Sequence, residues 1–153
     1  MNKPLVILIA GAVILSAGIA VAFFLPEEKA LVVKSSDVYT WDCEYPERKP
    51  EAITLTCGDG GQYIDEITWN TWGGTGAQGS GIYHVNDCDP SCAEGNFVST
   101  SVTIALSDLE TYQGESYLRS MSFETTSGEN LPNSGQSFYQ WDLMDFIEGM
   151  EKN

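Results

Sequence analysis

Apolar and polar residues alternate along much of the chain after residue 50, and this alternation predicts a mainly β domain. Successive side chains of a strand point to opposite faces, so a period of two marks one buried and one exposed face. The segments with this pattern are 53–57, 67–72, 79–85, 98–106 and 117–123. They are short and are separated by polar or glycine-rich turns, which favours a small antiparallel β-sandwich or barrel.

Two glycines interrupt the third of these segments. Gly79 and Gly81 lie inside a strand pattern, where a side chain would normally pack. Glycine in the interior of a strand indicates a bulge or a close approach of another part of the backbone. We therefore expect the sheet to bend or to be tightly packed at these two positions.

Aromatic residues of the domain are candidates for ligand binding. Trp69 and Trp72 are three residues apart, so on a regular strand their rings point to opposite faces. One ring belongs in the core. The other, which we take to be Trp72, could offer a flat stacking surface for a sugar together with Tyr83 or Trp41. The alternative is that this ring is covered by the C-terminal segment.

The C-terminal segment has a different period. Its apolar residues recur at intervals of three or four, as on one face of a helix: Tyr139, Leu143, Phe146, Ile147 and Met150. This spacing predicts a helix over 138–151. We expect the helix to pack as a lid on an open side of the sheet. The alternative is an exposed apolar stripe that binds a partner.

The N-terminal residues predict a membrane segment. The run 4–26 contains no charged residue, Lys3 precedes it and two glutamates follow it. A helix of this length crosses the hydrocarbon core, and the order of charges places the rest of the chain outside. We expect 1–26 to be an uncleaved single-pass anchor in the cell membrane. The alternative is a signal peptide cut after Ala22, which would give a secreted protein.

A stalk is predicted between the membrane and the domain. Residues 27–50 hold a short apolar stretch followed by polar residues, charged residues and prolines. The β-rich extracellular domain would then comprise 51–153, with the helix at its end. A domain of this size can bury a core of its own.

The charge of the chain narrows the range of partners. The formal net charge is −15, and all 22 acidic residues follow residue 26. A surface this acidic repels phosphate backbones, which excludes nucleic acid as a partner. The charge is explained by solubility, or by binding of cations or of a basic partner.

The four cysteines predict disulfides. An even number in an exported domain favours bridges, and four cysteines allow three connectivities. A bend at Pro90 could bring Cys88 and Cys92 together, and Cys43 would then pair with Cys57. The alternative is a zinc site in which His84 joins Cys57, Cys88 and Cys92, although the spacing is not that of a zinc finger.

Acidic residues near the second cysteine pair are candidate calcium ligands. They are Asp87, Asp89 and Glu94, with Asp59 from an earlier glycine-rich turn. Carboxylates from two adjacent loops could hold Ca²⁺. The EF-hand pattern fails, because Cys92 stands where its glycine belongs. The alternative is a solvated acidic loop without a metal, and no other cofactor is indicated.

Catalytic motifs are not recognisable. The chain has one histidine, and it has no nucleophile elbow, zinc-protease motif or phosphate-binding loop. No catalytic residue is singled out. Carboxylate pairs, which glycosidases use for catalysis, are abundant, so glycosidase activity remains an alternative.

Between residues 57 and 95 the chain resembles a known group of proteins. Its motifs are Cys-Gly-Asp-Gly-Gly at 57–61, Trp-x-x-Trp-Gly at 69–73 and Asn-Asp-Cys-x-Pro-x-Cys-Ala-Glu-Gly at 86–95. They resemble small secreted proteins of actinobacteria and related lineages whose function is uncharacterised. The resemblance implies an exported β-domain and carries over no catalytic residue. Cys43 and the helical tail depart from the pattern of that group.

These observations favour a non-enzymatic module on the cell surface. We expect a membrane-anchored acidic β-domain that binds a cell-surface protein or glycan, or that serves the structure of the cell envelope. The alternative is a secreted glycan-active or other hydrolase.

Overall fold

The computed structural model describes residues 33–151. The chain divides into two units, 1–30 and 31–153, and the fold below is that of the second. The predicted anchor at 1–26 lies outside the described residues. Within residues 33–151, none of the helices has the length and apolar character needed to cross a bilayer.

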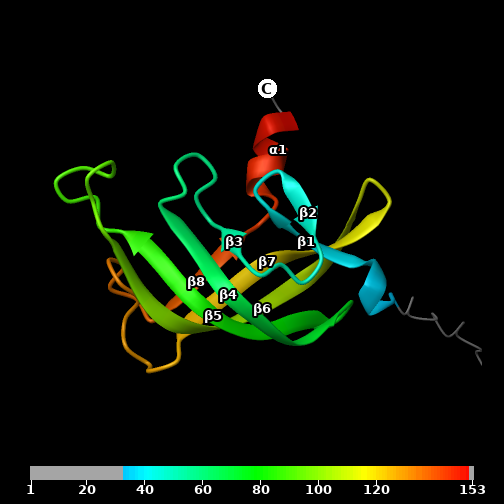
Figure 1. Cartoon of the computed structure of the whole chain (residues 1–153). Coiled ribbons are helices and arrows are strands. Elements are labelled where there is room, and N and C mark those ends of the chain that lie inside the picture. Colours follow the sequence, from blue (N-terminus) through cyan, green and yellow to red (C-terminus); the bar gives the residue numbers. More distant parts are fainter. Residues whose placement is uncertain (1–32, 152–153) are drawn as a thin grey trace, which may run out of the picture. The chain divides into compact units, whose positions relative to one another are not determined.

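The described unit is one curled β-sheet with a short C-terminal helix (Figure 1). Its elements are η1 Ser35–Asp37, β1 Val38–Asp42, β2 Tyr45–Glu47, β3 Ile53–Thr54, β4 Gln62–Gly73, β5 Gly76–Asn86, β6 Phe97–Tyr112, β7 Glu115–Thr125, β8 Phe138–Asp142 and α1 Asp145–Glu151. The strand order is β2-β1-β7-β6-β5-β4-β3, and β8 also pairs with β7. All pairs are antiparallel except the parallel pair of β1 and β7. The mainly β prediction is confirmed, and the architecture is a half-barrel.

Two bulges in β4 cause the sheet to curl. Asp65 pairs with Ile82 and Thr68 with Ser80, so two residues of β4 stand opposite Gly81. A second register shift leaves Asn70 as the extra residue. Each bulge moves the next apolar side chain back to the inner face after three residues instead of two. The residues of β4 that form the core or pack against it therefore follow an unequal spacing: Ile64, Ile67, Trp69 and Trp72.

Gly79 and Gly81 of β5 face these bulges. A Cβ atom on Gly79 would lie 2.7 Å from the carbonyl oxygen of Thr68, and one on Gly81 would lie 2.8 Å from that of Asp65. Any side chain at either position would collide with the backbone of β4. The close backbone approach predicted from the sequence is confirmed.

The first strand belongs to the sheet and not to a stalk. Val38 and Thr40 of β1 are fully buried, and the hydroxyl of Thr40 donates a hydrogen bond of 2.9 Å to the carbonyl of Leu118. The predicted boundary at Glu51 is therefore wrong for the part of 27–50 that forms β1 and β2. The physical reason is that β1 pairs with β7, a strand 78 residues away, which local composition does not reveal.

The C-terminal helix is shorter than the sequence predicted. Residues 138–142 form β8 along β7, and α1 begins at Asp145. Aromatic side chains favour strands when a partner strand is available, and β7 offers its edge here. Leu143 and Ile147 are buried against the core, whereas Phe146 is 38 % exposed. The helix therefore covers the sheet with only part of its apolar surface.

An arginine holds α1 to the sheet. The guanidinium of Arg119 in β7 lies 2.6 Å from Glu148 of α1, 2.7 Å from Asp142 at the end of β8 and 3.1 Å from Glu110 of β6. The pKa of Arg119 is raised by these three carboxylates, Asp142 first. The contacts fix the position of the β8–α1 corner, which forms one side of the candidate site.

Candidate binding groove

The two sides of the half-barrel are joined at one end. A disulfide connects Cys43, just after β1, with Cys57, just after β3. Beside it, the backbone N–H of Thr54 donates a hydrogen bond of 2.7 Å to the carboxylate of Asp42. These contacts close the gap between β1 and β3. The pairing of Cys43 with Cys57 is the one expected from the sequence.

Next to this closure the gap widens into a hollow of about 270 Å³, which we call the seam groove. One wall is formed by β3 and the residues after it, including Thr54 and Leu55. The opposite wall is the β8–α1 corner, residues 140–146. The groove therefore lies where β3, the last strand of the sheet order, faces β8 across the opening of the half-barrel.

Three aromatic side chains line the seam groove: Trp41, Trp141 and Phe146. Trp41 is 8 % exposed and stacks on Tyr117 with 5.3 Å between ring centroids. Trp141 is half-buried, and Phe146 is exposed. The groove thus presents one fixed indole and two more accessible rings.

Trp41 also carries an unsatisfied polar atom. The indole N–H groups of Trp69 and Trp72 donate to backbone carbonyls at 2.9 and 3.0 Å. The Nε1 atom of Trp41 is buried and has no hydrogen-bond partner among residues 33–151. Leaving such a donor unpaired typically costs about 1–3 kcal/mol.

The polar lining of the seam groove is uncharged or acidic. Gln140, Thr54 and Asp145 contribute an amide, a hydroxyl and a carboxylate, and within the described chain no Lys or Arg lines the groove. Asp142 is already engaged, because its carboxylate binds Arg119 and accepts a hydrogen bond of 3.0 Å from the N–H of Met144. The remaining side-chain acceptors of the described lining therefore come from Thr54, Gln140 and Asp145.

A second hollow, the polar pocket, lies further along the same opening and has a volume of about 360 Å³. Amide and phenol side chains dominate its lining: Gln62, Tyr83, Asn86, Asn133, Gln136 and Tyr139. Tyr83 donates a hydrogen bond of 3.3 Å to Gln62. Burial, together with the neighbouring Tyr139, raises the pKa of Tyr83 to about 12, so this phenol stays protonated at neutral pH.

Neither Trp72 nor Tyr83 offers the exposed stacking surface expected from the sequence. Trp72 is 9 % exposed, and its indole N–H bonds to Val38 of β1. Tyr83 is 2 % exposed and packs against Phe123. The bulge at Asn70 also brings Trp69 and Trp72 to the same face, where their rings meet edge to face at 4.9 Å. The assumption of a regular strand was wrong.

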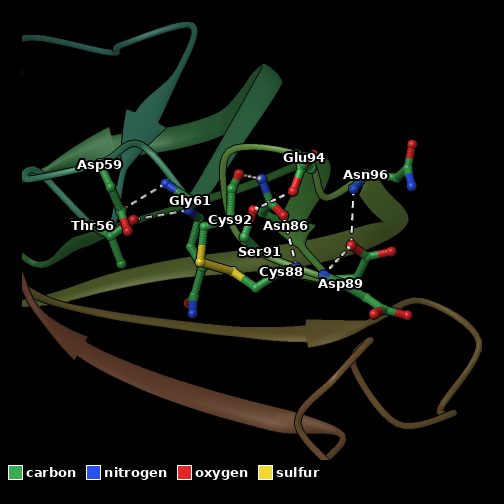
Figure 2. Close-up of a disulfide and its surroundings, with 12 residues drawn as sticks. Thr56, Asp59, Gly61, Asn86, Cys88, Asp89, Ser91, Cys92, Glu94 and Asn96 are labelled. Carbon is green, nitrogen blue, oxygen red and sulfur yellow. Dashed lines mark hydrogen bonds between the residues drawn. A yellow bond between two sulfur atoms is a disulfide. The ribbon is translucent and has the colours of Figure 1, made fainter.

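The second disulfide lies in the loop between β5 and β6, away from the seam groove. Cys88 and Cys92 are bonded, with 3.8 Å between their Cα atoms (Figure 2). All four cysteines are thus in disulfides, which rules out the zinc alternative.

The predicted calcium ligands serve their own loops instead. Asp87 accepts hydrogen bonds from the backbone N–H groups of Asn96 at 2.8 Å and Asp89 at 3.2 Å, and these bonds lower its pKa. Asp59 accepts one from Gly61 at 2.9 Å, which lowers its pKa in the same way.

Glu94 likewise accepts a hydrogen bond of 3.1 Å from the hydroxyl of Ser91 (Figure 2). Over residues 33–151, no three His, Cys, Asp or Glu side chains are grouped so that they could hold a metal ion. Four acids that are close in sequence or in adjacent loops are therefore not brought together as a calcium site.

His84 is held on the outer face of the sheet. Its Nε2 lies 2.9 Å from the carboxylate of Asp65, and its ring stacks on Tyr63 with 4.5 Å between centroids. Its chain neighbours Tyr83 and Val85 are buried on the inner face, so His84 points away from both hollows. These contacts give the histidine a structural role.

Comparison of the chain with protein-family models, with curated proteins and with solved structures gives no match. The resemblance of 57–95 to small secreted proteins stays a prediction. The function proposed below therefore rests on the geometry of the groove.

Proposed function

We propose that this chain is an exported binding module and that the seam groove holds a neutral saccharide. The two disulfides support an oxidising, extracytoplasmic location. The uncharged N-terminal run, which lies outside the described residues, supports a membrane anchor with the domain on the outer side.

The composition of the seam groove carries the proposal. The exposed ring of Phe146 and the half-buried ring of Trp141 line the groove beside the indole of Trp41. Sugars present C–H groups on one face of the ring and hydroxyls at its rim. The C–H face packs on aromatic rings, and the hydroxyls bind the few polar groups that orient a ligand in an apolar site.

The polar groups and the charge narrow the ligand class. Gln140 both donates and accepts hydrogen bonds, and Asp145 accepts them. The strongly acidic chain and the absence of Lys and Arg from the groove's described lining disfavour phosphorylated or carboxylated glycans, because anionic groups would be repelled.

A binding assay with matched variants tests this function. The full chain in detergent is titrated with trimers of β-1,4-linked glucose and of N-acetylglucosamine, and calorimetry measures the binding. We expect binding that falls by at least about tenfold in Trp141→Ala and in Phe146→Ala, which corresponds to about 1.4 kcal/mol. Phe97→Ala is the control, because Phe97 is an exposed ring that contacts Tyr63 on the outer face.

Two results would contradict the proposal. If Trp141→Ala and Phe146→Ala leave binding unchanged, the ligand binds outside the seam groove. If the chain binds none of a panel of neutral glycans, the proposed ligand class is wrong. Release of reducing ends from either trimer would favour the hydrolase alternative instead.

A further inference from the structure

The seam groove and the polar pocket share both of their walls. We propose that they are adjacent subsites of one site, so that the ligand is a chain of at least two linked neutral sugars lying along β8. This inference rests on the proposed function and extends it from a single sugar to an oligosaccharide.

The first shared wall is β8. Trp141 lines the seam groove, and Tyr139 lines the polar pocket. Residues two apart on a strand point to the same face and are separated by roughly 6.6 Å. The two ring centroids lie 6.1 Å apart with an angle of 32° between the planes. One strand therefore contributes a neighbouring side chain to each hollow.

The second shared wall is formed by β4 and the segment that leads away from β3. Leu55 lines the seam groove, and Gln62 lines the polar pocket. The backbone N–H of Leu55 donates a hydrogen bond of 2.9 Å to the carbonyl of Gln62. Neighbouring residues thus line the two hollows on this side as well, as adjacent subsites of one site require.

The two subsites offer different chemistry. The seam groove is aromatic, which suits the C–H face of a sugar. The polar pocket is lined by side-chain amides that can bind neighbouring hydroxyls as paired donors and acceptors, among them Gln62 and Gln136. Tyr83 and Tyr139 add phenol groups on the same side. One sugar would be held by stacking and the next by hydrogen bonds.

Chain length is the variable that tests this inference. The full chain in detergent is titrated with N-acetylglucosamine oligomers of one to six units and with the matching glucose oligomers. We expect the affinity to rise by about tenfold or more between the monomer and the trimer and then to level off, because one added hydrogen-bonded sugar contributes on that scale.

Variants of the polar pocket separate the two subsites. Gln136→Ala and Gln62→Ala should weaken binding of the trimer by about tenfold and leave binding of the monomer unchanged. Gln78→Ala is the control, because Gln78 is an exposed amide on the outer face between the buried residues Ala77 and Gly79. Thermal melting shows whether each variant is folded. If one of the two pocket variants does not fold, the other still tests the inference.

The outcomes distinguish this inference from the proposed function. Monomer binding that depends on Trp141 but shows no gain with chain length would overturn the oligosaccharide and leave the saccharide module standing. Equal weakening of monomer and trimer by the pocket variants would also overturn it, because the amides would then act on the first sugar. If the chain binds none of the oligomers, both the saccharide-binding function and the oligosaccharide ligand are contradicted.

Discussion

The opening of the half-barrel is closed in one place and hollow in the next. Between β1 and β3, a disulfide and the hydrogen bond from Thr54 to Asp42 join the two sides. Between β3 and β8, a short distance further along, side chains line the seam groove instead. The same gap in one sheet therefore serves stability at one end and supplies a cavity at the other.

The difference between the closed end and the seam groove depends on which strand edges are hydrogen-bonded to a neighbouring strand. β8 occupies the edge of β7 beyond the point where β1 leaves it, and it ends in the corner held by Arg119. A disulfide can bridge two edges that no hydrogen-bond ladder reaches, and it constrains the unfolded chain most when it closes a long loop. Changes at the closed end should thus affect unfolding, and changes at the groove should affect binding.

Removal of the disulfide at the closed end should affect stability more than a change at the bulge of β4 or at the exposed ring of the groove. Cys43→Ser with Cys57→Ser opens a loop of 14 residues, and we expect a loss of about 3 kcal/mol in the free energy of unfolding. Urea denaturation followed by tryptophan fluorescence measures it.

The matched control is the other disulfide. Cys88→Ser with Cys92→Ser opens a loop of only four residues, so the loss should be smaller. Equal losses for the two double variants would mean that the closure between β1 and β3 has no special role in stability.

A change at the bulge of β4 should have the next largest effect. The Cβ of Gly81→Ala would lie 2.8 Å from the carbonyl oxygen of Asp65 and 2.9 Å from the side chain of Ile64, so the two strands must separate. We expect a loss of about 1–3 kcal/mol, measured by the same urea titration. Gly58→Ala is the control, because nothing lies within 4 Å of its added Cβ. A neutral Gly81→Ala would show that the curl of the sheet does not depend on this contact.

A change at Phe146, the exposed ring of the groove, should have the smallest effect on stability. Phe146 is 38 % exposed, so we expect Phe146→Ala to cost less than about 1 kcal/mol while it weakens saccharide binding. Leu143, three residues earlier, is 6 % exposed, and Leu143→Ala should cost about 2–5 kcal/mol. Comparable thermal shifts for the two variants would mean that Phe146 belongs to the core and not to the binding surface.

Several features of the fold could be predicted because they depend on local pattern. The alternation in 98–106 marks the longest strand, and Gly79 and Gly81 indicate a close backbone approach that β4 provides. The short spacing of Cys88 and Cys92 around Pro90 predicts a disulfide between them. The remaining cysteines, Cys43 and Cys57, then form the second disulfide. In each case the evidence lies within a few residues along the chain.

The groove could not be predicted, although some of its signals are present. The aromatic run at 138–141 is typical of a strand, but the helical spacing of the residues that follow led to a helix over the whole segment. The intervals of three between Ile64 and Ile67, and between Trp69 and Trp72, are what bulges produce. Neither signal is decisive until the neighbouring strand is known.

An acidic, disulfide-containing β domain can be predicted from the sequence, because the composition gives the charge and the cysteines, and the side-chain period indicates which residues are buried. Which strand edges remain open depends on pairings between distant strands. β1 joins the sheet through a parallel pair with β7, and β8 takes the rest of that edge. The placement of Trp41, Trp141 and Phe146 around one groove follows from those long-range pairings, since hydrogen bonds between distant strands set the positions that the local pattern leaves undetermined.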